Sequence, residues 1–209
     1  TGATLLNLEN SRVRGLAENL PQITMDQPLP CVTVKGLPSG LAGLWGLFEI
    51  RIQAGKHKKM QRLHIPNLRR GFTSVFLSDE GKLFLPTARH IWDALQTEEA
   101  QVQASLGLDE SITAHERLME AVELAGRELF DTLQQIHIAA VTREEDRGSI
   151  AFASRRKTID RIGLPEVRRF RMTHCEAEES EWRNELLSSR QLVPEIRPLV
   201  MVRIIDGLG

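Results

Sequence analysis

Apolar and polar residues alternate along much of the first half of the chain, a pattern that predicts β-strands with one buried face. A β-branched run at residues 31–35 predicts a short strand. Residues 44–52 predict a longer strand, and the polar residues 55–59 predict the tip of a hairpin that returns through residues 60–65. Together these segments predict a small antiparallel sheet.

The segment 75–85 predicts a second hairpin, because two short apolar arms flank the polar residues 78–81. Gly81, the last of these four residues, can adopt the positive φ that a tight turn requires. Ahead of the sheet, residues 10–20 predict a short helix that stops before Pro21.

In the second half, apolar residues recur at steps of three and four, which is the spacing of amphipathic helices. One predicted helix begins at Pro86 and runs to about Gln103. The next begins at Asp109 or Ser111 and carries an apolar stripe along residues 118–136. A stripe of this kind indicates that one face of the helix packs against a partner element.

Turn residues 146–148 predict the end of that helix, and a basic helix is predicted from about Ile150. Gly163 ends the basic helix. Pro165 can open another helix as its first residue, since the N–H that proline lacks would be unbonded there. Two long helices joined by a short turn predict an antiparallel helical hairpin.

The last apolar run, residues 199–205, follows Pro194 and predicts a strand that must pair with the sheet of the first half. The predicted fold class is therefore α+β: a small antiparallel β-sheet core, a long antiparallel helical hairpin and a C-terminal strand that returns to the sheet. We expect one composite unit. Its parts are a β-rich core with a short helix (1–95), a helical region (96–190) and the returning strand (191–209).

Composition narrows the class of protein. The chain has 209 residues, of which 41% are hydrophobic and 26% charged, as is ordinary for a globular domain. No apolar run approaches the roughly 20 residues of a membrane span, and no signal segment opens the chain. Two cysteines far apart, Cys31 and Cys175, fit a reducing cytoplasm and argue against a zinc site. The first residue is Thr, so we expect a piece of a longer polypeptide.

Charge adds a candidate function, because a net charge of −1 conceals a strongly basic block. Residues 155–171 hold seven Lys and Arg against two acids, and the acidic residues 176–185 then reverse the sign. A basic helical face can neutralise nucleic-acid phosphates. The predicted nucleic-acid-binding residues are Arg155, Arg156, Lys157, Arg161, Arg168, Arg169 and Arg171, with Lys58 and Lys59 of the first hairpin tip.

The same block has an alternative, structural use. Its cations can pair across the helical hairpin with acids of the preceding helix, as a ladder of surface ion pairs. These acids are Glu116, Glu120, Glu123, Glu128 and Asp131.

Catalytic motifs are missing from the sequence. It contains no phosphate-binding loop of the GxxxxGKS/T type and no GxGxxG turn after a strand. The six histidines show no metal-ligand spacing, and Cys31 is expected to be a small buried residue. We therefore predict no catalytic residue, metal or cofactor in this segment. A hydrolase would require the fold to bring scattered His and Glu residues together.

Two groups of residues carry a resemblance to a known family. They are GLWGLFEIR at 43–51 with residues 76–82 and 86–92, and RIGLPEVR at 161–168 with Glu179, Trp182 and residues 194–199. Together they resemble the C-terminal region of large bacterial Swi/Snf-related, ATP-dependent helicases of superfamily 2, of the type found in phage-defence systems such as DISARM. The resemblance implies an accessory region of a double-stranded-DNA translocase, partnered by motor domains of the same polypeptide. ATP and magnesium would bind in that motor, and no catalytic residue is carried over to this region.

Two hypotheses follow. In the first, the chain is a non-catalytic accessory module that braces a helicase motor and contacts DNA phosphates through the basic block. In the second, it is a protein-interaction module whose helical hairpin docks a partner subunit. Phe170 and Trp182, if exposed, would be the anchors of such an interface, because aromatic residues dominate interface energies.

Overall fold

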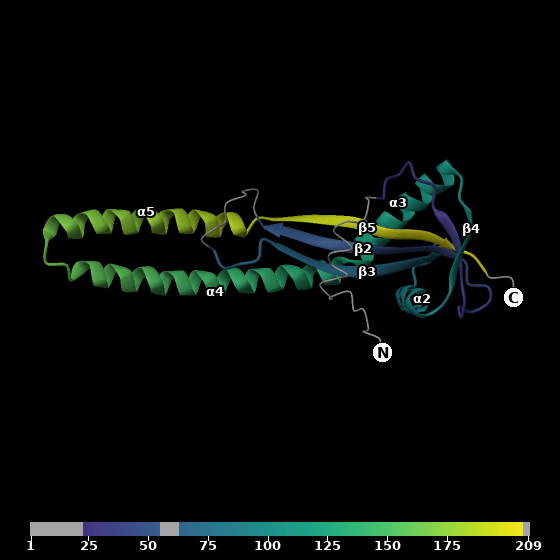
Figure 1. Cartoon of the computed structure of the whole chain (residues 1–209), viewed down its shortest axis with the longest axis horizontal. Helices are drawn as coiled ribbons and strands as arrows, with labels where there is room; N and C mark the ends of the chain where they lie inside the picture. The colour runs from purple at the N-terminus through teal and green to yellow at the C-terminus, as the bar shows by residue number, and fades with distance from the viewer. Residues whose placement is uncertain (1–22, 55–62, 207–209) are drawn as a thin grey trace. The chain divides into compact units, whose positions relative to one another are not determined.

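The computed structural model describes residues 23–54 and 63–206, and within these ranges the chain forms five strands and four helices (Figure 1). In chain order they are β1 Pro30–Val34, β2 Gly43–Ala54, β3 Leu68–Ser78, α2 Leu85–Thr97, β4 Ala100–Ser105, α3 Leu108–Ala125, α4 Arg127–Asp160, α5 Pro165–Ser189 and β5 Leu192–Ile204. The helix predicted at residues 10–20 and the β-hairpin turn predicted at residues 55–59 lie outside the described residues.

The five strands form one sheet in the order β3-β2-β5-β1-β4. The predicted α+β class and the return of the C-terminal strand to the sheet are confirmed. The sheet is mixed, however, and not wholly antiparallel as predicted. Strand β1 pairs antiparallel with β4 but parallel with β5, where Cys31 lies opposite Arg203. The parallel pair arises because a long crossover lets β5 enter the sheet beside β1 in the same direction.

The chain divides into two compact units. The first, which we call the sheet unit, comprises Thr1–Ile50, Gly71–Leu129 and Ile196–Gly209. The second, the hairpin unit, comprises Arg51–Arg70 and Phe130–Glu195.

Two apolar clusters, one on each face of the sheet, form the core of the sheet unit. Because side chains alternate along a strand, β2 sends Trp45 to one cluster and Phe48 to the other. Helix α2 packs in the first cluster through Ile91, and α3 packs in the second through Leu118. The indole N–H of Trp45 donates to the carbonyl of Ala88 at 2.9 Å, which satisfies a polar group inside the first cluster.

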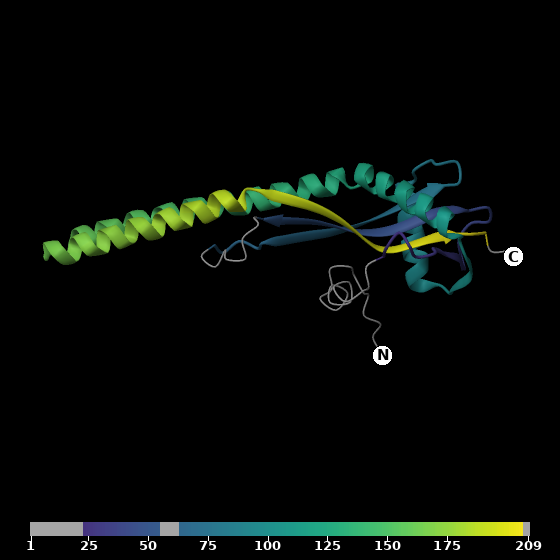
Figure 2. The ribbon, with the colours of Figure 1, turned by 90° about the horizontal axis from the view of Figure 1, so that it is seen from above.

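In the hairpin unit, α4 and α5 run side by side in opposite directions, as the two views of the ribbon show (Figures 1 and 2). An apolar cluster that includes Val141, Trp182 and Leu186 joins the two helices. His137 is buried in α4, and its ring Nε2 donates to the carbonyl of Ser189 at 2.9 Å. The predicted antiparallel helical hairpin is therefore present.

The hairpin turns at a different place from the one predicted. Residues 146–148 lie inside α4, which continues without a break to Asp160, and the chain reverses at residues 161–164. Pro165 opens α5, as predicted. The glycine at position 148 belongs in the helix because the indole of Trp182 packs directly against its backbone.

Two helix ends also differ from the predictions. The stripe at residues 118–136 spans two helices, α3 and α4, which meet at Gly126. A side chain does not fit at this position, because a Cβ would lie 2.8 Å from the carbonyl oxygen of Val122 and against Ile50. Helix α2 ends at Thr97, and β4 replaces the predicted helical turn up to Gln103. The six residues of β4 alternate between apolar and polar, but all of them are exposed, so the strand buries no apolar face and depends on pairing with β1.

The strand boundaries show the same dependence on partners. The predicted hairpin was expected to return through residues 60–65, of which residues 60–62 lie outside the described ranges. The strand that follows β2 is β3, and it begins later, at Leu68. Strand β5 begins at Leu192, before the predicted start at residue 199, and therefore contains Pro194. The predicted turn at residues 78–81 is confirmed by a φ of +81° at Gly81.

Candidate nucleic-acid interface

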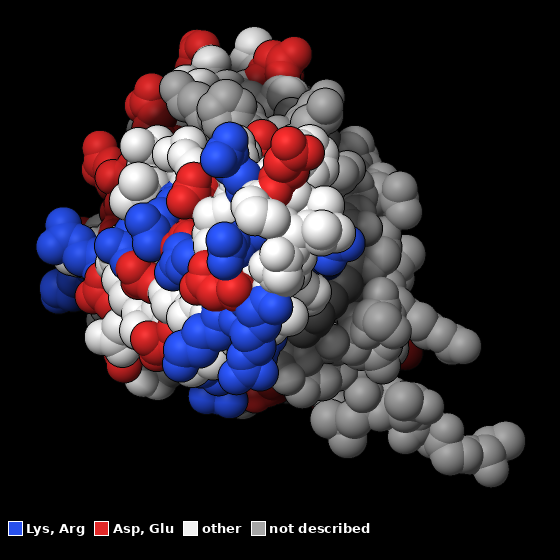
Figure 3. Space-filling model, turned by 90° about the vertical axis from the view of Figure 1, so that its left-hand side faces the viewer, with Lys and Arg blue, Asp and Glu red and all other residues white. Residues whose placement is uncertain are grey.

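The basic block lies at the closed end of the hairpin, and we call residues 155–171 the hairpin tip. The tip comprises the end of α4, the connection at residues 161–164 and the start of α5. The turn predicted at residues 146–148 would have put the whole block on the returning arm. The block instead straddles both arms and the turn between them. Figure 3 looks onto this end, where Lys and Arg side chains gather among scattered acids.

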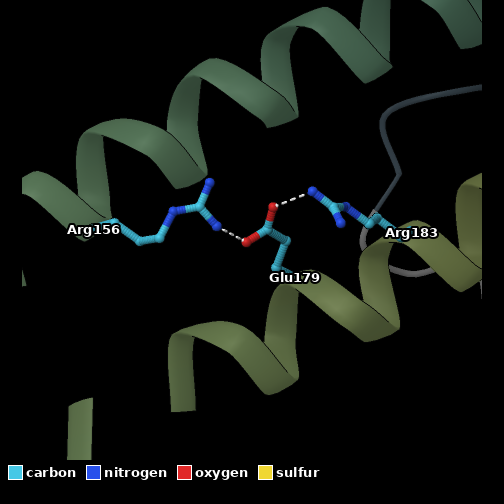
Figure 4. Close-up of polar contacts among 3 residues, drawn as sticks. All are labelled: Arg156, Glu179 and Arg183. Atoms are coloured by element: carbon cyan, nitrogen blue, oxygen red, sulfur yellow. Dashed lines mark hydrogen bonds and ion pairs between the residues drawn. The ribbon is translucent and has the colours of Figure 1, made fainter. Parts of the chain in front are cut away.

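Two of the seven cations are held by acids of the opposite arm. Arg155 donates to Glu178, and Arg156 donates to Glu179. A second guanidinium, that of Arg183, donates to the other carboxylate oxygen of Glu179 at 2.7 Å (Figure 4). Because Glu179 is only 5% exposed, these charge-assisted bonds replace the water that its carboxylate loses on burial.

The acids in these pairs are not those that the alternative hypothesis named. That hypothesis expected partners among residues 116–131, which belong to α3 and the start of α4. The partners instead come from the acidic stretch at residues 176–185 of α5, because the chain reverses at residues 161–164. Once the turn is placed there, the antiparallel register brings this acidic stretch opposite Arg155 and Arg156.

Five cations of the tip are exposed and have no ion pair among the residues that the structure describes. They are Lys157, Arg161, Arg168, Arg169 and Arg171. The remaining predicted residues, Lys58 and Lys59, lie outside the described ranges. The tip thus combines two cations with a structural role and five whose charge faces solvent.

Apolar side chains are exposed at the same end. Phe170 is 72% exposed and Leu164 is 66% exposed, whereas Trp182 is buried in the hairpin core. Of the two anchors proposed for a protein interface, only Phe170 is therefore accessible. Beside Phe170 lies a groove of about 240 Å³, lined by Arg155, Thr158, Ile159, Phe170, Arg171 and His174.

Comparison with models of protein families, with curated proteins and with solved structures found no match.

The described residues hold no group of three or more His, Cys, Asp or Glu side chains that could bind a metal ion. Cys31 and Cys175 are buried and unbridged. His115 is buried on α3, and burial lowers its pKa, with Glu116 acting in the opposite direction. His174 lies at the tip and pairs with Glu178 at 3.1 Å. None of the described helices is both long and apolar enough to cross a membrane.

Proposed function

We propose that the chain is a non-catalytic accessory module of an ATP-dependent DNA helicase or translocase, and that its hairpin tip binds DNA phosphates. The single observation that carries the phosphate-binding part is a set of five cations within one hairpin end that are exposed and have no ion pair with any described residue. The resemblance of residues 161–168 and 43–51 to Swi/Snf-related helicases supports the accessory role.

Electrostatic attraction favours a phosphate group as the ligand of the tip. Each Lys or Arg that contacts a phosphate releases condensed counterions, so the affinity depends on salt and not on base sequence. The acids within the tip are Asp160 and Glu166, which leave it strongly positive even when Arg155 and Arg156 are counted as neutralised. A guanidinium also presents a planar fork that matches a phosphate group.

In this function the motor domains belong to the same polypeptide, and ATP and magnesium bind there. The module would brace the motor while the tip follows the DNA backbone. Helices suit such a contact, because a rigid element positions its side chains more accurately than a loop does.

The test removes three unpaired cations and leaves the ion pairs in place. We expect the triple variant Lys157→Gln, Arg168→Gln, Arg169→Gln to bind a short random-sequence duplex about 10- to 100-fold more weakly near 100 mM salt. The slope of log affinity against log salt should fall by about three, one for each lost phosphate contact. The measurement is fluorescence anisotropy of the labelled duplex over a salt series.

A matched control distinguishes the effect of the tip cations from the effect of a lower net charge. The variant Lys35→Gln, Arg89→Gln, Arg143→Gln removes three exposed cations that lie elsewhere and should bind the duplex like the wild type. Equal weakening in both variants, or none in the tip variant, would contradict phosphate binding by the tip.

A second candidate function is protein docking, and the exposure of Phe170 and Leu164 favours it. In that case the tip would dock the motor of the parent polypeptide in the absence of nucleic acid. Binding to the separately produced motor should then be lost in the variant Phe170→Ser, Leu164→Ser and retained in the triple Gln variant.

A further inference from the structure

Phe170 occupies an unusual place at the tip. It lies between Arg169 and Arg171 in the first turns of α5, and its ring is 72% exposed. On a helix that buries Trp182 and Leu186 in the hairpin core, an aromatic ring left in water among cations suggests a ligand. The chemistry around the ring indicates which ligand fits.

The ring borders the groove between the two arms. Ile159, which is 5% exposed, contributes an apolar side chain from α4, and His174 follows Phe170 by one helical turn on α5. Arg171 and Thr158 add polar groups to the lining. The groove thus combines an apolar wall, an accessible aromatic face and donors for an anion.

The charge of the lining differs from one end of the groove to the other. Glu178 neutralises Arg155 and also pairs with His174, so the part of the lining nearest these residues does not attract anions. Arg169 and Arg171 have no ion pair among the described residues. They precede and follow Phe170 along α5, and Arg171 lines the groove together with the ring. A phosphate is therefore favoured beside the ring and not deeper along the arms.

Duplex and single strands use such a surface differently. In a duplex the bases are stacked on one another, so the ring could contribute little and only the cations would bind. In a single strand an unpaired base can stack on an aromatic ring while neighbouring phosphates contact Arg or Lys. A lone phosphate or an acidic peptide would use the cations and leave the ring without a partner.

We propose that the hairpin tip binds single-stranded nucleic acid, with one unpaired base stacked on Phe170 and the adjacent phosphates held by Arg169 and Arg171. This inference rests on the proposed function, because it assumes that the tip binds nucleic-acid phosphates. It assigns the preferred form of the nucleic acid and the residue that selects it.

The test compares three probes with the full chain. Two have equal charge: a mixed-sequence single strand and the same strand with abasic sites at all central positions. The third is the corresponding duplex, whose second strand adds further phosphates. We expect the single strand to bind about 5- to 100-fold more tightly than the abasic strand, as stacking of one base would give. Phe170→Leu should remove that difference, and Phe170→Trp should keep it. The salt slope should stay the same in both variants, since no cation is removed.

Because Phe170 is exposed, both variants should retain the circular dichroism spectrum and the unfolding midpoint of the wild type. The possible failures are distinguishable. If the single strand and the abasic strand bind equally and Phe170→Leu changes nothing, base stacking is wrong and phosphate binding stands. If none of the probes binds, the proposed function itself is wrong. Loss of binding to the motor in Phe170→Leu, with nucleic-acid binding unchanged, would make the ring a protein contact and overturn the inference.

Discussion

Glu179 shows how a single side chain acquires a role that its sequence neighbours lack. The acidic stretch at residues 176–185 has the sequence of a solvated helix face, and four of its five glutamates are exposed or partly exposed. Glu179 alone faces the opposite arm closely enough to be buried, and there it binds both Arg156 and Arg183. Its partners keep 38% and 64% of their side-chain surface exposed, so the cluster is buried on the acidic side only.

We predict that Glu179→Gln lowers the free energy of unfolding by about 1–2 kcal/mol, because two charge-assisted hydrogen bonds become neutral or are lost. Urea denaturation followed by circular dichroism measures this change. The control is Glu178→Gln, which removes the neighbouring and more exposed carboxylate and should cost about 0–1 kcal/mol. Equal costs for the two variants would show that burial of Glu179 has no energetic role.

At the scale of elements, the close approach of α4 and α5 depends on Gly148. A helix interior normally disfavours glycine relative to alanine by about 1 kcal/mol. Here a Cβ at position 148 would overlap the indole ring of Trp182, which is itself fixed in the hairpin core beside Phe152. The tertiary contact therefore outweighs the helix propensity.

Gly148→Ala should accordingly destabilise the protein by about 1–3 kcal/mol through overpacking, although the same change usually stabilises a helix. Gly163→Ala is the matched control, because a Cβ there meets nothing within 4 Å and should leave the stability nearly unchanged. Thermal and urea unfolding of both variants measure the difference. A stabilised Gly148→Ala protein would contradict the packing of Trp182 against this position.

At the scale of the whole molecule, the order of the strands makes the C-terminus essential to the fold. Strand β5 lies between β2 and β1, so the last strand of the chain is the middle strand of the sheet. Its residues Leu199, Met201 and Ile204 are buried and belong to the two clusters of the sheet unit.

We predict that truncation after Pro198 abolishes cooperative unfolding. Loss of three large buried side chains, at about 2–5 kcal/mol each, approaches or exceeds the about 5–15 kcal/mol that stabilises a typical domain. Truncation after Ile205 keeps all of β5 and is the control. Urea titration followed by tryptophan fluorescence compares the two proteins. A sharp, native-like transition in the shorter protein would show that the sheet does not need its central strand.

The sequence by itself determined those features that depend on a few neighbouring residues. The α+β class follows from local periodicity, the turn at residues 78–81 from Gly81, and the start of α5 from Pro165, which has no N–H to bond. The basic block is likewise evident from the sequence, because its seven Lys and Arg residues lie close together along the chain. Each of these signals depends on residues that are close together in the sequence, so each feature can be predicted without knowledge of the rest of the fold.

The tertiary structure alone decided which distant segments meet. It placed the reversal at residues 161–164, kept Gly148 inside α4, paired the fully exposed β4 with β1 and put β5 in the middle of a mixed sheet. It also divided the seven cations of the tip into two that are paired with α5 and five that face solvent. Each of these outcomes depends on the register between elements far apart in sequence, which no local pattern encodes.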